Sequence, residues 1–140
     1  MPALQFTCVA IGSRAVLISG PPGSGKSSLA LMLIDRGAAL IGDDSVLLDS
    51  GGKRLVARPH PKTRGLIEVR NLGLIEMPAC DGAVVSLVIE FDEAAPRYIE
   101  QAETVTIESV TLPMLRIWPD TTALAIKAEL ALDRFGLAGD

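Results

Sequence analysis

The chain has 140 residues, of which 49% are hydrophobic and 21% are charged, and its formal net charge is −4. This length and composition predict one globular domain over residues 1–140 and exclude an intrinsically disordered chain. The negative charge argues against general nucleic-acid binding, because no excess of basic residues is available to neutralise many phosphates.

The N-terminal residues and the cysteines indicate the compartment. The first five residues carry no basic group and no apolar run approaches ~18 residues, so we expect neither a signal peptide nor contact with a membrane. Cys8 and Cys80 are not in a metal-ligating spacing, which favours two buried thiols in a reducing compartment. We therefore expect a cytoplasmic protein.

In chain order, the first elements are two predicted strands. Residues 4–11 are mostly apolar, Gly12-Ser13 can form a tight turn, and residues 15–18 form a short apolar run that ends near Gly20. These segments predict a hairpin that leads into the next motif.

Residues 20–27 carry the strongest functional signal, because they read Gly-Pro-Pro-Gly-Ser-Gly-Lys-Ser, the pattern of a phosphate-binding loop. The glycines let backbone N–H groups converge on phosphate oxygens, Lys26 supplies a positive charge, and the Ser27 hydroxyl can ligate Mg²⁺. We therefore predict that the chain binds ATP and Mg²⁺; the alternative is an ordinary Gly-rich turn. The predicted nucleotide-binding residues are Gly20, Pro21, Pro22, Gly23, Ser24, Gly25, Lys26, Ser27 and Ser28.

A helix and a short strand follow the loop. Residues 26–36 contain no Gly or Pro and predict a helix with Gly37 at its C-terminal cap, and residues 38–41 predict a buried strand that ends on Asp43-Asp44. A direct return strand would bring this pair back to the phosphate site, where one carboxylate could accept a proton from an attacking hydroxyl. We expect the two carboxylates to face opposite ways, as adjacent strand residues do. The alternative is that the pair only opens a turn.

The middle of the chain predicts a hairpin, a loop and one further strand. Residues 47–57 form two apolar runs around a Gly-rich turn, and residues 58–65 are a basic, proline-containing loop that holds the sole histidine, His60. In the strand-like run 66–75, Glu68 and Arg70 would share one face and suit a site for Mg²⁺ and phosphate. The alternative is an ion pair on a half-exposed strand.

The last third predicts two strands and a helix. Residues 83–89 read as a central strand, and Glu90 or Asp92 at its end is a second candidate for the acid beside the metal. Residues 104–112 predict a strand that residues 115–118 could extend, and residues from Thr121 or Thr122 to Phe135 predict a helix that covers one sheet face with a threonine cap.

Taken together, these motifs resemble the C-terminal catalytic domain of HPr kinase/phosphorylase. The resemblance rests on the loop at residues 20–27, on Leu40-Ile41-Gly42-Asp43-Asp44-Ser45-Val46 and on Ile67-Glu68-Val69-Arg70-Asn71-Leu72-Gly73, and it fades after about Val110. It implies an α/β fold: a P-loop nucleotide-binding domain similar to the core of phosphoenolpyruvate carboxykinase, with a mixed sheet and flanking helices. It also implies a protein serine kinase that acts on HPr, the phosphocarrier of the sugar phosphotransferase system, and a homo-oligomer, which is often a hexamer in the family.

The resemblance assigns roles to individual residues. Lys26 would bind phosphate and act in catalysis, Ser27 and Glu68 would hold Mg²⁺, Asp43-Asp44 would supply the proton acceptor, and Arg70 belongs to the signature segment. Arg97 matches a phosphate-contacting arginine more weakly. These assignments name Lys26, Asp43, Asp44, Arg70 and Arg97 as catalytic and Ser27 and Glu68 as metal ligands.

Three departures from the family pattern affect the expected activity. Gln5 stands where the family usually has a histidine. The resemblance covers only the catalytic domain, so we expect a short form of the family without the N-terminal domain of longer members. The stretch linked to dephosphorylation is present only as Pro113-Met114-Leu115-Arg116-Ile117, so we expect kinase activity to exceed phosphorylase activity. A small-molecule kinase and a non-catalytic nucleotide-binding regulator are the alternative functions.

Overall fold

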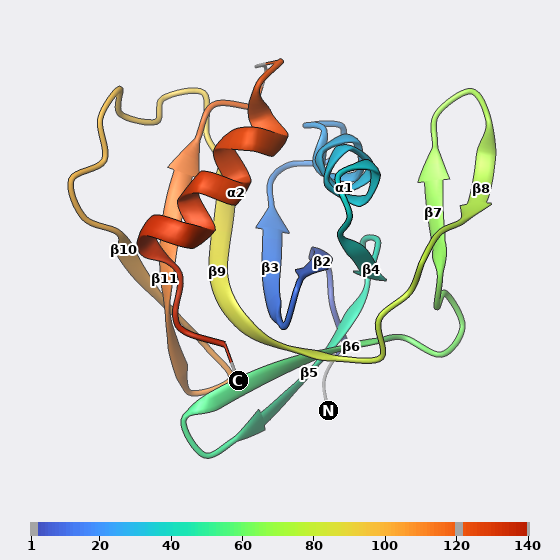
Figure 1. Ribbon diagram of the computed structural model, residues 1–140, viewed down its shortest axis with the longest axis horizontal. Helices are drawn as coiled ribbons and strands as arrows, with labels where there is room; N and C mark the ends of the chain where they lie inside the picture. The colour runs from blue at the N-terminus through green and yellow to red at the C-terminus, as the bar shows by residue number, and fades with distance from the viewer. Residues whose placement is uncertain (1–2, 120–121, 140) are drawn as a thin grey trace.

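The computed structural model describes residues 3–119 and 122–139, which form a mixed α/β fold (Figure 1). The strands and helices are, in chain order, β1 (Ala3–Leu4), β2 (Thr7–Ile11), β3 (Arg14–Ser19), α1 (Lys26–Asp35), β4 (Ala39–Gly42), β5 (Val46–Gly51), β6 (Arg54–Pro59), β7 (Leu66–Val69), β8 (Gly73–Glu76), β9 (Ala83–Phe91), β10 (Glu103–Ile107), β11 (Val110–Ile117) and α2 (Leu124–Phe135).

The main sheet is mixed, as predicted. Its strands run in the order β1-β5-β6-β9-β3-β2-β4, and β11 joins β9 with β10 outside it. Strands β3 and β11 pair with β9 in parallel, whereas the β2–β3, β2–β4, β5–β6, β6–β9 and β10–β11 pairs are antiparallel. The predicted central strand is therefore confirmed: β9 is almost wholly buried and pairs with β6 near its start and with β11 near its end.

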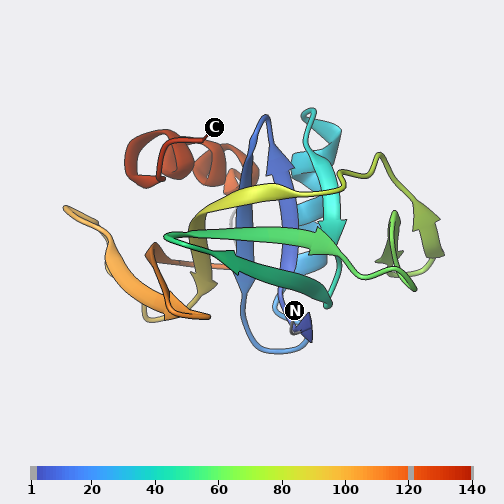
Figure 2. The same cartoon turned by 90° about the horizontal axis from the view of Figure 1, so that it is seen from below.

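Alternating side chains of the sheet build two apolar cores. Val16 and Ile18 of β3 pack with Leu29 and Leu33 of α1 and with α2, so both helices cover one face (Figure 1). Leu17, between them in sequence, points to the other face and packs with β5 and β6. Figure 2 shows the green β5–β6 hairpin lying across the blue strands β2 and β3, which closes this second core.

Four sequence-based boundaries differ from the structure. The first predicted strand is divided, with Gln5 and Phe6 between β1 and β2. The run 66–75 is a β7–β8 hairpin rather than one strand, because Asn71 takes a left-handed φ of 74° and reverses the chain. The segment 104–112 likewise turns at Glu108 and Ser109, with φ 48° and 68°, so that β10 pairs back onto β11, which ends at Ile117 before Trp118.

The predicted C-terminal helix is present but begins later than expected. Its N-cap is Ala123 and no side chain caps it, so the Thr122 cap is wrong, and Thr121 lies outside the described residues. Among the described residues, neither α1 nor α2 has the combination of length and apolar character that is needed to cross a lipid bilayer.

Candidate active site

The phosphate-binding pattern lies where the sequence predicted, between β3 and the first turn of α1. Gly23 and Gly25 have φ of 78° and 102°, which explains why glycine is needed at both positions. Gly25 is also the N-cap of α1, so the loop delivers a ligand to the free N–H groups of the first helical turn. The hydroxyl of Ser24 is buried in this loop without a partner among the described residues, which leaves an unused hydrogen-bonding group at a place suited to phosphate.

A cavity of about 600 Å³ opens beside the loop, within the size range of small-molecule sites. It gathers most of the predicted site residues from α1, from the bend after β4 and from the β7–β8 hairpin. Its lining consists of Pro22, Gly23, Gly25, Lys26, Ser27, Ser28, Leu31, Asp43, Asp44, Glu68, Val69, Arg70 and Leu74. The apolar members Leu31, Val69 and Leu74 were not predicted, because apolar residues in a helix or hairpin give no signal of a ligand.

Lys26 and Asp44 form an ion pair at the cavity wall. The Lys26 ammonium donates to Asp44 Oδ1 over 3.1 Å, and the side chains are 12% and 71% exposed. Because Asp44 is so exposed, water screens this pair, and Lys26 can exchange it for a phosphate oxygen at low cost.

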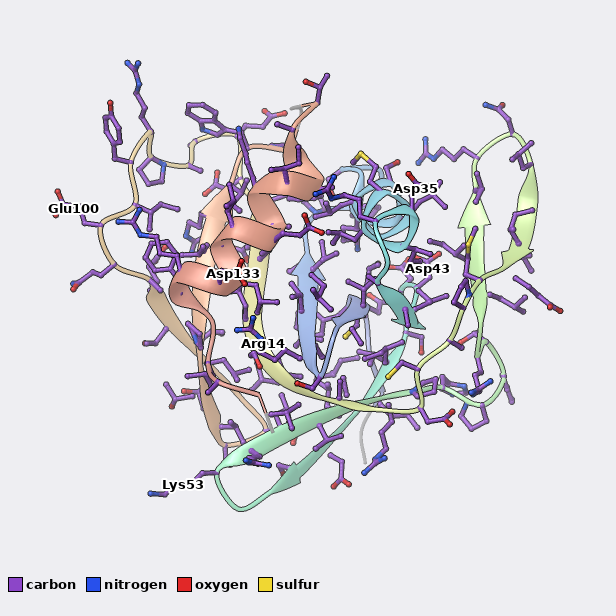
Figure 3. All side chains as sticks on the ribbon, in the orientation of Figure 1. Arg14, Asp35, Asp43, Lys53, Glu100 and Asp133 are labelled. Atoms are coloured by element: carbon purple, nitrogen blue, oxygen red, sulfur yellow. The ribbon has the colours of Figure 1, made fainter. Side chains whose placement is uncertain are left out.

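Asp43 is held by donors from three different elements. Its Oδ1 accepts hydrogen bonds from the Ser27 hydroxyl, 2.6 Å away, and from the Thr7 hydroxyl, 3.3 Å away, while Oδ2 accepts the backbone N–H of Glu68 over 3.1 Å. Figure 3 shows Asp43 below α1 and beside β4. The carboxylate therefore connects α1, β2 and the β7–β8 hairpin.

The strand-alternation argument for the aspartate pair is wrong, although the pair does line the cavity. Strand β4 ends at Gly42, so Asp43 and Asp44 lie in a bend and not in the strand. Asp44 has a left-handed φ of 60°, and a Cβ on Gly42 would lie 2.1 Å from the Ser45 carbonyl oxygen. The bend thus depends on glycine at position 42, and the bend, not the pleat, gives the two aspartates different partners.

Glu68 and Arg70 both line the cavity, as predicted. They are not brought together by sharing one face of a strand, because Arg70 lies in the turn after β7. Arg70 Nη2 lies 3.6 Å from where a Cβ on Gly23 would stand, so the guanidinium lies against the phosphate-binding loop. Within the described residues Glu68 and Arg70 form no ion pair with each other, which does not support the ion-pair alternative.

Glu90 and Asp92, the second candidates for the metal-side acid, lie outside the cavity. Both pair with Arg116: Glu90 makes a close ion pair, and Asp92 lies 3.7 Å away. Glu90 and then Glu103 raise the pKa of the Arg116 guanidinium. These carboxylates therefore form ion pairs that link β9, β10 and β11, and they do not line the cavity beside the glycine-rich loop.

Arg97, Gln5 and the stretch 113–117 also lie away from the cavity. Arg97 follows β9 and has its guanidinium 5.8 Å from the ring centre of Tyr98. Figure 3 labels Glu100 of the same segment, far from Asp43. Gln5, where the family usually has a histidine, is exposed and does not line the cavity. The stretch 113–117 is part of β11 and does not line it either.

The donors at the cavity suit Mg²⁺ better than a metal held by protein alone. No group of three or more His, Cys, Asp or Glu residues that could hold a metal occurs in the described part of the chain. Mg²⁺ commonly uses one or two carboxylates, phosphate oxygens and water. The Ser27 hydroxyl gives its proton to Asp43, which leaves its oxygen lone pairs free for a cation, and Glu68 lines the same cavity.

A glycine-rich loop that joins a buried strand to a helix N-terminus, within a mixed sheet covered by helices, places the chain in the class of α/β proteins. A family model, HPr Serine kinase C-terminal domain, matches residues 3–117. The chain belongs to this family.

Curated relatives are named HPr kinase/phosphorylase. The protein from Neisseria meningitidis serogroup C is 37% identical over 110 residues, which cover 73% of this chain and 34% of the relative. The protein from Mycoplasma mycoides is 34% identical over 100 residues, covering 66% of this chain and 32% of the relative. The chain therefore spans about a third of the length of the curated relatives it matches.

The fold has a close counterpart among solved structures. The HPr(Ser) kinase/phosphatase from Coxiella burnetii superposes with a TM-score of 0.84, over 95% of both chains, at 23% sequence identity. This likeness confirms the predicted α/β fold with a mixed sheet and flanking helices, whereas the similarity to the core of phosphoenolpyruvate carboxykinase stays a prediction.

Proposed function

We propose that this chain is an ATP-dependent protein kinase that phosphorylates a serine of the phosphocarrier HPr. The proposal depends on one observation: a single cavity is lined by residues of the glycine-rich loop together with Lys26, Asp43-Asp44 and Glu68. The names of the relatives supply the acceptor, because they are HPr kinases. A small-molecule kinase would need a basic lid over its phosphate site, and it is not favoured because the basic loop 58–65 contributes no residue to the lining.

In this proposal the loop and Lys26 bind the phosphates of ATP. The first N–H groups of α1 and the glycine-rich backbone would hold the β- and γ-phosphates, with Lys26 leaving Asp44 to contact them. Ser27 and Glu68 would hold Mg²⁺, which when bound neutralises charge that develops on the transferred phosphoryl group. Arg70, beside Gly23, is placed to steady the same phosphates.

In this proposal the aspartate pair accepts the proton of the serine hydroxyl. A serine hydroxyl becomes a better nucleophile when a carboxylate within hydrogen-bond reach accepts its proton. Asp43 is the better ordered of the two, since three donors fix its orientation, whereas Asp44 is exposed and paired with Lys26. We assign Asp43 as the base and Asp44 as the residue that holds Lys26 before ATP binds. Arg97 receives no role in this proposal, because it does not line the cavity.

The wider properties of the chain are part of the proposal. We propose one domain over residues 1–140, supported by the packing of α2 into the same core as α1. We also propose cytoplasmic function, a homo-oligomer as in the family, and kinase activity in excess of phosphorylase activity, because residues 113–117 depart from the family pattern and lie away from the cavity.

An acceptor comparison tests the proposal. The purified chain is incubated with labelled ATP and Mg²⁺ in three reactions that contain HPr, a mixture of hydroxyl-bearing metabolites, or no acceptor. The proposal predicts label in HPr alone. Label in a metabolite would support a small-molecule kinase, and ATP binding without transfer to any acceptor would support a regulator.

A further inference from the structure

Thr7, the first residue of β2, is a fully buried polar residue that none of the roles above uses. Among the described residues the buried polar side chains are Thr7 and Ser86. A buried hydroxyl is costly unless it is hydrogen-bonded, so its partners indicate why it is present. For Ser86 the partner is the Val84 carbonyl in its own strand. For Thr7 the partners are the two aspartates of the cavity.

The Thr7 hydroxyl contacts both aspartates at once. It donates to Asp43 Oδ1 over 3.3 Å, and it accepts the backbone N–H of Asp44 over 3.4 Å. The first bond acts on the Asp43 side chain, and the second acts on the Asp44 backbone at its left-handed φ of 60°. One hydroxyl therefore links the orientation of one carboxylate to the backbone that carries the other.

The position of this hydroxyl is fixed by the sheet. Strand β2 lies between β3 and β4, with Thr7 opposite Ile18 of β3 and Cys8 opposite Gly42 of β4. Strand β3 leads directly into the phosphate-binding loop, and β4 leads directly into the aspartate bend. Thr7 thus ties the bend to the same rigid strand pair that carries the loop.

We infer that Thr7 is a positioning residue: its hydroxyl sets the Asp43-Asp44 bend so that Asp43 reaches Ser27 and Asp44 reaches Lys26. The inference rests on the proposed kinase function for its kinetic consequence. Without the hydroxyl, Asp43 Oδ1 keeps only the Ser27 donor and the Asp44 N–H loses its acceptor. Small displacements of reacting groups can cost about 10²-fold in rate.

Three variants test the inference kinetically. Thr7→Val keeps the shape and removes the hydroxyl, Thr7→Ser keeps the hydroxyl, and Ser86→Ala is the control that removes another buried hydroxyl far from the cavity.

We expect Thr7→Val to lower kcat for HPr phosphorylation by roughly 10-fold to 100-fold with KM for ATP nearly unchanged, and Thr7→Ser to keep most of the wild-type kcat. We expect Ser86→Ala to keep the wild-type kcat even if its melting temperature falls. Wild-type kcat in Thr7→Val, or equal losses in Thr7→Val and Thr7→Ser, would overturn the inference.

A second measurement needs no transfer activity. Hydrogen exchange of the Asp44 amide, followed by NMR in the protein without nucleotide, should be slow in wild type and Thr7→Ser and at least about 10-fold faster in Thr7→Val. Equal exchange in all three proteins would overturn the inference even if HPr is phosphorylated. If wild type transfers no phosphate to HPr, the proposed function fails, and the exchange rates still decide whether Thr7 holds the bend.

Discussion

Asp43 and Asp44 are adjacent in sequence but differ in what holds them. Asp43 accepts hydrogen bonds from Ser27, Thr7 and the Glu68 amide, and Asp44 pairs with Lys26 at the exposed rim of the cavity. Substitution by asparagine therefore has different consequences at the two positions, since an amide NH₂ cannot accept the donors that face a carboxylate oxygen.

We predict that Asp43→Asn loses roughly 10²–10⁴ in kcat, because it removes the proposed base and leaves a donor without an acceptor. Asp44→Asn should lose less than about 10-fold, because its screened ion pair contributes little. Steady-state kinetics of both variants with HPr and ATP checks this. Equal losses, or a greater loss in Asp44→Asn, would contradict the assignment.

Glu68 is the second carboxylate whose role can be separated. Glu68→Gln should raise the Mg²⁺ concentration for half-maximal activity several-fold, because a neutral amide is a weaker ligand for a hard cation. Glu76→Gln, on β8 of the same hairpin but outside the cavity lining, is the matched control. An unaltered Mg²⁺ titration in Glu68→Gln would show that Glu68 is not a ligand of the proposed metal site.

At the level of elements, the bend between β4 and β5 depends on the absence of a side chain at Gly42. A Cβ there would lie 2.1 Å from the Ser45 carbonyl oxygen, whereas a Cβ on Gly51 of β5 would meet nothing within 4 Å. Gly42→Ala must therefore displace backbone, and the displaced bend carries both aspartates.

We predict that Gly42→Ala lowers the free energy of unfolding by roughly 1–3 kcal/mol and abolishes most phosphotransfer, as expected for a forced backbone shift. Gly51→Ala, the matched control, should change neither by much. Urea denaturation and initial-rate assays of the two variants make the comparison. Normal activity in Gly42→Ala would show that the aspartates do not need this bend.

The elements also show what local sequence could and could not predict. The loop, α1 and β9 were predicted because each depends on a local pattern: glycines beside Lys26, a run without breakers, and a long apolar stretch. The β10–β11 turn was missed because Glu108 and Ser109 are not typical left-handed residues. Thr7 was missed because its partners stand 36 and 37 positions away, and a threonine at the start of a strand signals only β propensity.

For the whole molecule, the buried thiol of Cys8 in the second core makes the free energy of unfolding depend on pH. Burial, with a smaller effect of Cys80, raises the pKa of the Cys8 thiol far above its ordinary range. Below a pH of about 8.5 the thiol is protonated in both the folded and the unfolded chain, so its full contribution to the free energy of unfolding is present. Above it the unfolded chain releases the proton and the folded chain does not, so stability falls as pH rises, by up to about 1.4 kcal/mol per pH unit.

We therefore predict that the free energy of unfolding of wild type falls more steeply from roughly pH 8 to 10 than that of Cys8→Ala. The alanine variant lowers the starting value by leaving a cavity, so the slope and not the absolute stability is the readout. Denaturant titrations at several pH values give both slopes. Parallel curves would show that Cys8 does not carry the effect.

The central claim, that the cavity beside the loop transfers phosphate from ATP to a serine of HPr, has one direct test. HPr is incubated with MgATP and either wild type or Lys26→Ala, and the site of phosphate is mapped by mass spectrometry; phosphorylated HPr is incubated with inorganic phosphate in parallel. We predict phosphoserine with wild type, none with Lys26→Ala, and slower dephosphorylation than phosphorylation. Unmodified HPr after incubation with a folded, ATP-binding wild-type chain, or equal transfer by Lys26→Ala, would contradict the account.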